Sequence, residues 1–140
     1  MGQQQLLLII VGLIVVALGV VVGITLFKDN AISANRDAVT SDLVSIAAHA
    51  QQYLRRPTTL GGGQGSFSAL TADAAGLGKL TSMTNGKNAN GSYTILTAGT
   101  GTLLVLQGRG METGNDGSNP VKVVMNVWAD SARVDELRMN

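Results

Sequence analysis

The residues that could carry out catalysis or bind a ligand are few in this chain, and they form no known constellation. His49 is the single histidine and lies among alanines, where a surface or packed role is the ordinary one. Residues 61–65 (Gly-Gly-Gly-Gln-Gly) lack the Lys-Ser/Thr pair and the strand–helix context of a phosphate-binding loop. Residues 115–117 (Asn-Asp-Gly) match only part of a calcium loop and predict a turn. Cysteine is absent from the sequence, which excludes zinc–thiolate and disulfide chemistry. We therefore expect no catalytic residue, no cofactor and no metal, and predict that the chain is not an enzyme.

Signals for modification and for nucleic-acid binding are weak or missing. Residues 90–92 (Asn-Gly-Ser) form an N-glycosylation sequon on an expected loop, so Asn90 is a weak candidate for glycosylation. The formal net charge is only +1, whereas a protein that neutralises phosphates needs a basic patch. No nucleic-acid partner is predicted.

The charged side chains are confined to one part of the chain. All of them lie in residues 28–140, and residues 1–27 contain none. Residues 6–27 are Leu, Ile, Val and Phe, with only three Gly, one Ala and one Thr. About 20 such residues span a hydrocarbon core of about 30 Å as a helix. Their large apolar side chains contribute about −5 to −10 kcal/mol toward insertion. The sequence therefore predicts an apolar helix over residues 1–27 that enters a membrane.

Two alternatives to a membrane helix fit less well. A buried helix of a soluble domain would need a larger domain around it than the remaining chain can build. A cleaved secretory signal normally has a basic start and a shorter apolar run. Here the N-terminus is Met-Gly-Gln-Gln-Gln, without a basic side chain.

The helix is expected to continue beyond the apolar segment, over residues 28–56. No Gly or Pro occurs between Ile24 and Arg56, and Pro57 then ends the helix. One apolar stripe recurs there at helical spacing, which predicts a face that packs on a sheet. The stripe consists of Ile32, Val39, Leu43, Ile46, Ala50 and Tyr53. The whole helix would have about 50 residues and a length of about 75 Å.

Residues 57–140 are rich in glycine and predict a small globular head. A short helical turn and a loop are expected over residues 67–80. Antiparallel strands are expected over residues 93–97, 102–107, 121–128 and, with a weaker pattern, 133–139; residues 108–120 read as a turn-rich loop. A sheet this small needs a helix over one face. The predicted fold class is α+β, with one long N-terminal helix packed on a small C-terminal antiparallel sheet.

This order of elements resembles the type IV pilin and pseudopilin superfamily. The resemblance rests on the opening MGQQQLLLII, the uninterrupted helix, the glycine-rich loop and the small sheet. It implies a subunit that waits in the inner membrane with its head outside. The resemblance further implies that an assembly machinery draws the subunit into an extracellular helical filament of identical subunits, whose core is the bundled N-terminal helices.

The sequence also departs from the usual pilin pattern. Pilins commonly carry a carboxylate at mature position five, which here holds Gln5, or Leu7 if counting starts after Gly2. The usual basic leader and the C-terminal disulfide loop are missing. Gln3, Gln4 and Gln5 either mark the polar membrane interface or offer hydrogen bonds to neighbouring subunits without the cost of a buried charge.

Gly19 and Gly23 form a pair of small residues four positions apart. Such a pair lets helices approach closely in an apolar medium, although glycine is common in membrane helices anyway. The three valines between them are moderate helix formers, so the pair could instead mark a place where the helix unwinds. Both interpretations remain open from sequence.

The sequence thus predicts a structural protein that polymerises through its apolar helix. The residues expected to take part in assembly are Gln3, Gln4, Gln5, Leu6, Leu7, Gly12, Val16, Gly19, Gly23 and Phe27. The alternatives are a pseudopilin of a secretion system and a single-span membrane protein whose small domain binds a partner without polymerising.

Overall fold

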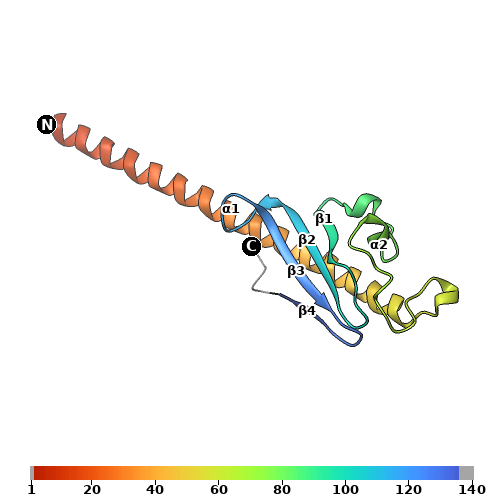
Figure 1. The fold of residues 1–140 in the computed structure, drawn as a ribbon. Coiled ribbons are helices and arrows are strands. Elements are labelled where there is room, and N and C mark those ends of the chain that lie inside the picture. Colours follow the sequence, from red (N-terminus) through yellow and green to blue (C-terminus); the bar gives the residue numbers. More distant parts are fainter. Residues whose placement is uncertain (1, 136–140) are drawn as a thin grey trace.

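The computed structural model describes residues 2–135, without the side chain of Thr84. Its dominant element is helix α1 (Gly2–Arg55), which has 54 residues and no break. The first half of α1 projects from the head as a free stalk, and the second half runs along the head (Figure 1). The absence of Gly and Pro between Gly23 and Pro57 explains why the two halves form one rod, because those residues most often interrupt helices.

The end of α1 is fixed by proline and glycine. Pro57 precedes a single 3-10 turn, η1 (Thr58–Leu60), and Gly61 closes that turn in the left-handed conformation (φ 76°). A second short helix, α2 (Ala74–Gly78), begins where the Asp73 carboxylate accepts a hydrogen bond from the Gly76 amide at 2.7 Å. The second 3-10 turn is η2 (Thr84–Gly86). These short elements connect α1 to the sheet.

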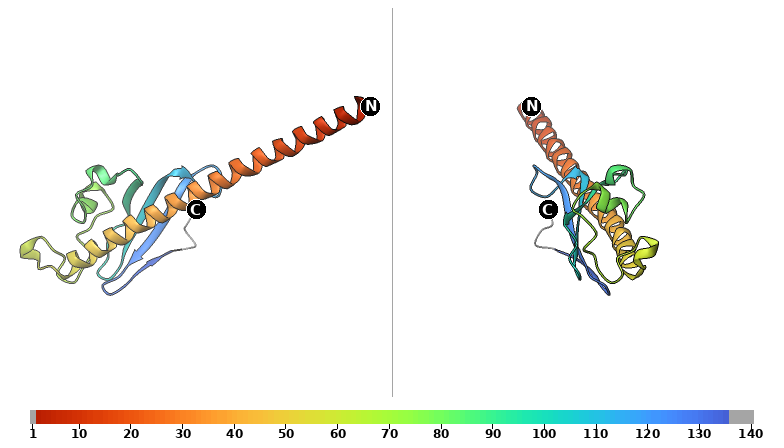
Figure 2. Two further views of the ribbon diagram at one scale, coloured as in Figure 1. Left: turned by 180° about the vertical axis from the view of Figure 1, so that it is seen from behind. Right: turned by 45° about the vertical axis from the view of Figure 1, so that its right-hand side comes forward.

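The head contains one antiparallel sheet of four strands in sequential order. The strands are β1 (Gly91–Thr97), β2 (Leu104–Thr113), β3 (Pro120–Val127) and β4 (Ala132–Val134). The register pairs Tyr93 with Gly108 and Gly108 with Val123. The second half of α1 lies across one face of this sheet (Figures 1 and 2). The predicted α+β class is therefore confirmed.

The strand bounds correct the sequence prediction at β2. Residues 108–113 were expected in a loop but continue the strand, whereas residues 102–103 precede it. The glycine content that indicates a loop has another cause here. A Cβ atom on Gly108 would lie 2.5 Å from Val39 Cγ1 and 3.2 Å from Leu43 Cδ1. Glycine at this position lets α1 approach the sheet closely, as glycines inside strands often do.

The last strand begins one residue earlier than expected. β4 covers Ala132–Val134, while residues 136–139 of the predicted fourth strand lie outside the described residues. β4 pairs with β3 through Met125–Val134 and Val127–Ala132. It therefore forms one edge of the sheet, and β1 forms the other.

One hydrophobic core lies between α1, the sheet and the α2 segment. On the helix side it is built by Val39, Leu43, Ile46, Ala47, Ala50, Tyr53 and Leu54, all buried. On the sheet side the alternating residues Val121, Val123, Met125 and Val127 of β3 face it. Phe67 and Leu70 close the core beside the sheet.

Candidate functional site

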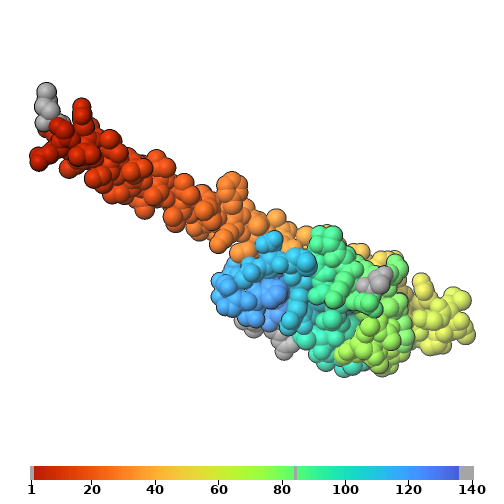
Figure 3. Space-filling view, turned by 90° about the horizontal axis from the view of Figure 1, so that it is seen from above, coloured from red at the N-terminus to blue at the C-terminus, as the bar shows by residue number. Residues whose placement is uncertain are grey.

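The apolar half of α1 is the most unusual surface of the molecule. Seventeen large apolar side chains between Leu6 and Phe27 are exposed, from 49% for Val11 to 78% for Phe27. A soluble monomer rarely exposes a contiguous apolar patch larger than a few hundred Å². This segment is apolar on every side, it projects away from the head (Figure 3), and none of its apolar window is buried within the chain. It requires a non-aqueous environment or a partner.

By length and composition, this segment can cross a membrane. Among residues 2–135, α1 is the one helix long and apolar enough to do so. A core helix of a soluble protein passes the same test, but none of the apolar window is buried within this chain. Membrane anchoring and a signal sequence both agree with this finding.

The glutamines lie at the free end of the stalk. Gln3, Gln4 and Gln5 are exposed, and Gln3 and Gln4 border a shallow hollow with Leu7 and Leu8. Their side-chain amides have no hydrogen-bond partner within residues 2–135. All their donors and acceptors are therefore available to water, lipid headgroups or another copy of the chain.

The glycines of the stalk leave space on an unbroken helix. A Cβ atom at Gly12, Gly19 or Gly23 would meet nothing within 4 Å. The helix does not unwind beside Gly19 or Gly23 in the isolated chain, and the packing notch stays a prediction. Thr25 donates its hydroxyl hydrogen to the Val21 carbonyl oxygen at 3.0 Å, which satisfies the one side-chain hydroxyl of the segment. Val16, at the middle of the stalk, is 64% exposed.

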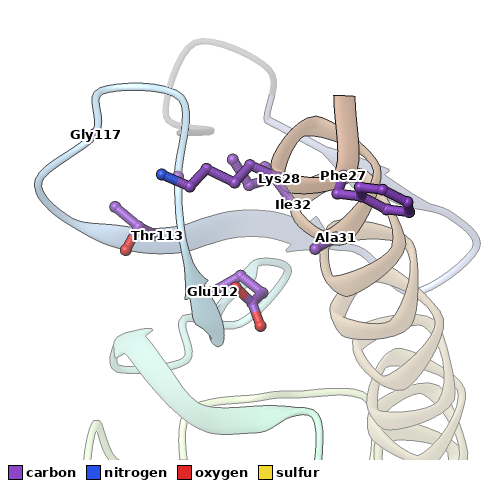
Figure 4. Close-up of a pocket in the computed structure, with 8 residues that line it drawn as sticks. Phe27, Lys28, Ala31, Ile32, Glu112, Thr113 and Gly117 are labelled. Atoms are coloured by element: carbon purple, nitrogen blue, oxygen red, sulfur yellow. The ribbon is translucent and has the colours of Figure 1, made fainter. Parts of the chain in front are cut away.

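A pocket lies where the stalk meets the head. α1 contributes Phe27, Lys28, Ala31 and Ile32, and the end of β2 with the following turn contributes Glu112, Thr113, Gly114 and Gly117. We call this the neck pocket; its volume is about 470 Å³. Lys28 extends from α1 toward the turn between β2 and β3 (Figure 4). The apolar surface of the stalk therefore continues into a concave site on the head.

A polar cluster attaches the second half of α1 to the edge of the sheet. Oδ2 of Asp42 accepts hydrogen bonds from Tyr93 Oη at 2.5 Å, Asn88 Nδ2 at 2.8 Å and Asn90 Nδ2 at 2.8 Å. Partial burial alone would raise the pKa of Asp42, but the bonds from Tyr93, Asn90 and Asn88 outweigh it and lower that pKa. Burial and the bond to Asp42 raise the pKa of Tyr93 well above its usual range.

Asn35 makes a second polar attachment two turns earlier on α1. Its Oδ1 accepts hydrogen bonds from the backbone amides of Met111 at 3.0 Å and Glu112 at 3.3 Å. Its Nδ2 donates to the Asn90 carbonyl oxygen at 3.0 Å. Asn35 and Asp42 therefore fix β2 and the residues before β1 against the helix.

The sequon residue Asn90 is part of this cluster. It is half-buried, and its Nδ2, the atom to which a glycan would be attached, donates to Asp42. A glycan at Asn90 would have to displace this contact. This contact could not be predicted from the sequence, because Asp42 and Asn90 are distant in the chain.

The predicted stripe residues lie on the face of α1 that covers the sheet. Val39, Leu43, Ile46, Ala50 and Tyr53 are buried. Ile32 is half-buried, packs against the core and also lines the neck pocket.

The residues considered as candidates for catalysis or metal binding lie on the surface of α1 or in a turn. His49 is exposed on α1. Oδ1 of Asp116 accepts hydrogen bonds from the amides of Ser118 and Asn119, which shapes the turn predicted over residues 115–117. Among residues 2–135, no group of three or more His, Asp or Glu side chains could hold a metal ion.

The polar contacts of Asn35, Asp42 and Tyr93 were missed by sequence reasoning. Asn35 and Asp42 each lie three or four positions from residues of the apolar stripe. Residues at that spacing share one face of a helix, so both lie beside the stripe. Polar residues on an apolar face are the available sequence signal for such contacts.

No protein-family model, curated protein or solved structure matches this chain. What the structure shows is an architecture: a long helix with an exposed apolar first half, whose second half packs on a small four-stranded antiparallel sheet. That architecture is pilin-like.

Proposed function

We propose that the chain is the repeating subunit of an extracellular pilus-like helical filament and polymerises through residues 6–27 of α1. Its role is structural and involves no catalysis. The subunit waits in the inner membrane and is passed to the filament by an assembly machinery.

The observation that carries this proposal is the continuity of α1. A simple membrane anchor is commonly joined to its domain by a flexible linker, whereas here the exposed apolar segment continues without a break into the core of the head. A rigid connection fixes the orientation of each head relative to its apolar helix. Such fixed geometry is needed when identical subunits repeat the same contact along a helix.

The composition of the two parts supports the same proposal. When the stalk leaves a membrane it must find an equally apolar environment, and the stalks of neighbouring copies provide one. All the charged side chains lie in residues 28–140, the second half of α1 and the head, which face water. In a filament the stalks would form the core and the heads the surface.

A charge in the middle of the stalk tests the proposal. Val16→Asp adds about 2.5–3.5 kcal/mol at the membrane centre, less than the total that favours insertion, so the variant should still enter the membrane. In a filament core the carboxylate would be surrounded by apolar helices, and assembly should fail. Asn115→Asp, which adds the same charge to an exposed turn, is the matched control. Filaments sheared from cells of the native host and imaged by electron microscopy give the readout.

Removal of residues 1–27 gives the complementary test. The truncated head should be soluble and monomeric and should form no filaments. If it still builds native filaments, or if Val16→Asp assembles as well as Asn115→Asp, the helical-core proposal is wrong. A membrane protein that binds a partner through its small domain would then be the better interpretation. A short filament confined to the cell envelope would instead indicate a pseudopilin.

A further inference from the structure

The two ends of the head carry different and complementary surfaces. The neck pocket lies at the end where the stalk emerges, and residues 57–66, which we call the tip loop, project from the opposite end (Figures 1 and 3). Two such surfaces at opposite ends of one subunit can form a head-to-tail contact between copies. A contact of this kind repeats without closing when the rotation between copies does not complete a ring.

The tip loop is held rigidly against the end of α1. The amides of Gly63, Gln64 and Gly65 donate to the carbonyl oxygens of Tyr53 at 2.8 Å, Arg56 at 3.0 Å and Leu54 at 2.7 Å, respectively. On this fixed frame Leu60 is 69% exposed. A rigid loop loses little conformational entropy when it binds, so it is suited to insertion into a preformed pocket.

The neck pocket offers the apolar surface that Leu60 lacks. Phe27, Ala31 and Ile32 supply an apolar wall, and the volume of about 470 Å³ falls in the range of pockets that hold small ligands. Gly114 and Gly117, on the opposite side, have no side chains to fill it. A leucine with part of its loop can therefore enter.

The charges around the two surfaces are of opposite sign. Arg55 and Arg56 are exposed at the base of the tip loop. Glu112 lines the neck pocket, and Asp29 is exposed on the adjoining turn of α1. Among residues 2–135, Lys28 is the one cation that lines the pocket, and it reaches toward the β2–β3 turn (Figure 4). Charge complementarity of this kind selects register and orientation between partners.

We propose that the tip loop of one copy, with Leu60 as its anchor, docks into the neck pocket of a second copy. Arg55 and Arg56 then lie near Asp29 and Glu112 of that second copy. The inference rests on the proposed filament function and adds a specific contact between heads. Because 28 residues of α1 separate Phe27 from Arg55, the two copies are displaced along the helix axis by about 42 Å.

Cysteine cross-linking in filaments tests this contact directly. The natural chain has no cysteine, so introduced thiols are the only ones. The pair Leu60→Cys with Ala31→Cys places one thiol on the tip loop and one in the neck pocket, both at positions exposed in the isolated subunit. The control pair joins Leu60→Cys to Thr94→Cys, an exposed position on β1. Filaments sheared from native-host cells are treated with a short bismaleimide and separated by denaturing gel electrophoresis.

The expected result is a ladder of dimers and higher multimers for the tip–neck pair, at least tenfold stronger than for the control pair or either single cysteine. Imaged filaments without such a ladder would overturn the docking proposal and leave the filament function standing. In that case, protection of Ala31→Cys from a soluble maleimide would assign the pocket to a neighbouring stalk or a lipid. If no variant and no wild-type sample forms filaments, the filament function itself fails, and the docking proposal fails with it.

Discussion

The hydroxyl of Tyr93 on edge strand β1 and the carboxylate of Asp42 in the second half of α1 are joined by a hydrogen bond of 2.5 Å. The Tyr93 ring is buried in the core, while its hydroxyl reaches the half-buried carboxylate. Asn88 and Asn90 donate to the same Asp42 oxygen. One carboxylate thus organises the junction between helix, loop and sheet edge.

Replacing Asp42 with alanine should destabilise the head. The substitution leaves the donors of Tyr93, Asn88 and Asn90 without their acceptor, and we expect a loss of about 2–4 kcal/mol. Urea unfolding of the full-length chain in detergent, followed by the fluorescence of the single tryptophan Trp128, measures the change. Asp37→Ala, at an exposed position of the same helix, should change stability by about 0.5 kcal/mol or less. Equal losses for the two variants would contradict the role given to the cluster.

The same junction predicts a bell-shaped dependence of stability on pH. The pKa of Asp42 is lower in the folded head than its ordinary value of 3.8, so the unfolded chain binds more protons as the pH falls. The stability from Asp42 is therefore present above about pH 4 and is lost as the pH falls through the lower, folded pKa. The pKa of Tyr93 is raised from its ordinary value of 10.0, so stability should also fall as the pH rises above 10. Urea midpoints measured across this range should show a weaker acid limb in Asp42→Asn. Part of the limb should stay, because hydrogen bonds from the Thr71 hydroxyl and the Gly76 amide also lower the pKa of Asp73.

Truncation of the buried stripe should cost far more than truncation of the opposite face of α1. Leu43 and Ile46 are 0% and 1% exposed, and replacing either with alanine should cost about 2–5 kcal/mol. Val44 lies between them in sequence but is 54% exposed, so Val44→Ala should be nearly neutral in the isolated subunit. The same urea assay compares the three variants. A large loss of unfolding free energy for Val44→Ala, with small losses for the other two variants, would show that the opposite face of α1 packs on the sheet.

Gly19 and Gly23 allow assembly to be separated from folding. A methyl group at either position meets nothing within the chain, and alanine is the better helix former by about 1 kcal/mol. Gly19→Ala and Gly23→Ala should therefore keep or increase helix content, measured by circular dichroism in detergent. If the pair is a packing notch between stalks, both substitutions should reduce filament yield. Gly12→Ala, outside the pair, should reduce it less; equal yields for all three and wild type would exclude the notch.

The long helix could be predicted from the sequence, and so could the difference between its apolar first half and its second half, which packs on the sheet. A run without charge, followed by a stripe at helical spacing without Gly or Pro, predicts both the stalk and the covering face, because each signal is local. The extent of β2 was not accessible in this way. Gly108 and Gly110 look like loop residues until α1 is placed over the sheet, where residue 108 has no room for a side chain.

Part of the candidate site could likewise be predicted from the sequence, and part could not. The apolar character of the stalk is a property of consecutive residues and was predicted. The neck pocket and the Asp42 cluster join residues about 50 to 90 positions apart, so they depend on how the head folds back on α1. Asn35 and Asp42 gave the only local hint, as polar residues on an apolar face.

The unbroken passage of α1 from stalk to head also sets a rotational phase between the two. One residue inserted between Phe27 and Ile32 would turn the stalk by about 100° relative to the head and shift it by about 1.5 Å. Lipid surrounds the stalk evenly, and the stalk is apolar on every side, so membrane insertion should hardly sense that turn. A filament would sense it, because each head would then face a new direction relative to its neighbours. Insertion of seven residues, nearly two whole turns, would leave a phase error of only about 20° but lengthen the rod by about 10 Å. Angle and length can therefore be varied almost independently in this chain, which a flexible linker would not permit.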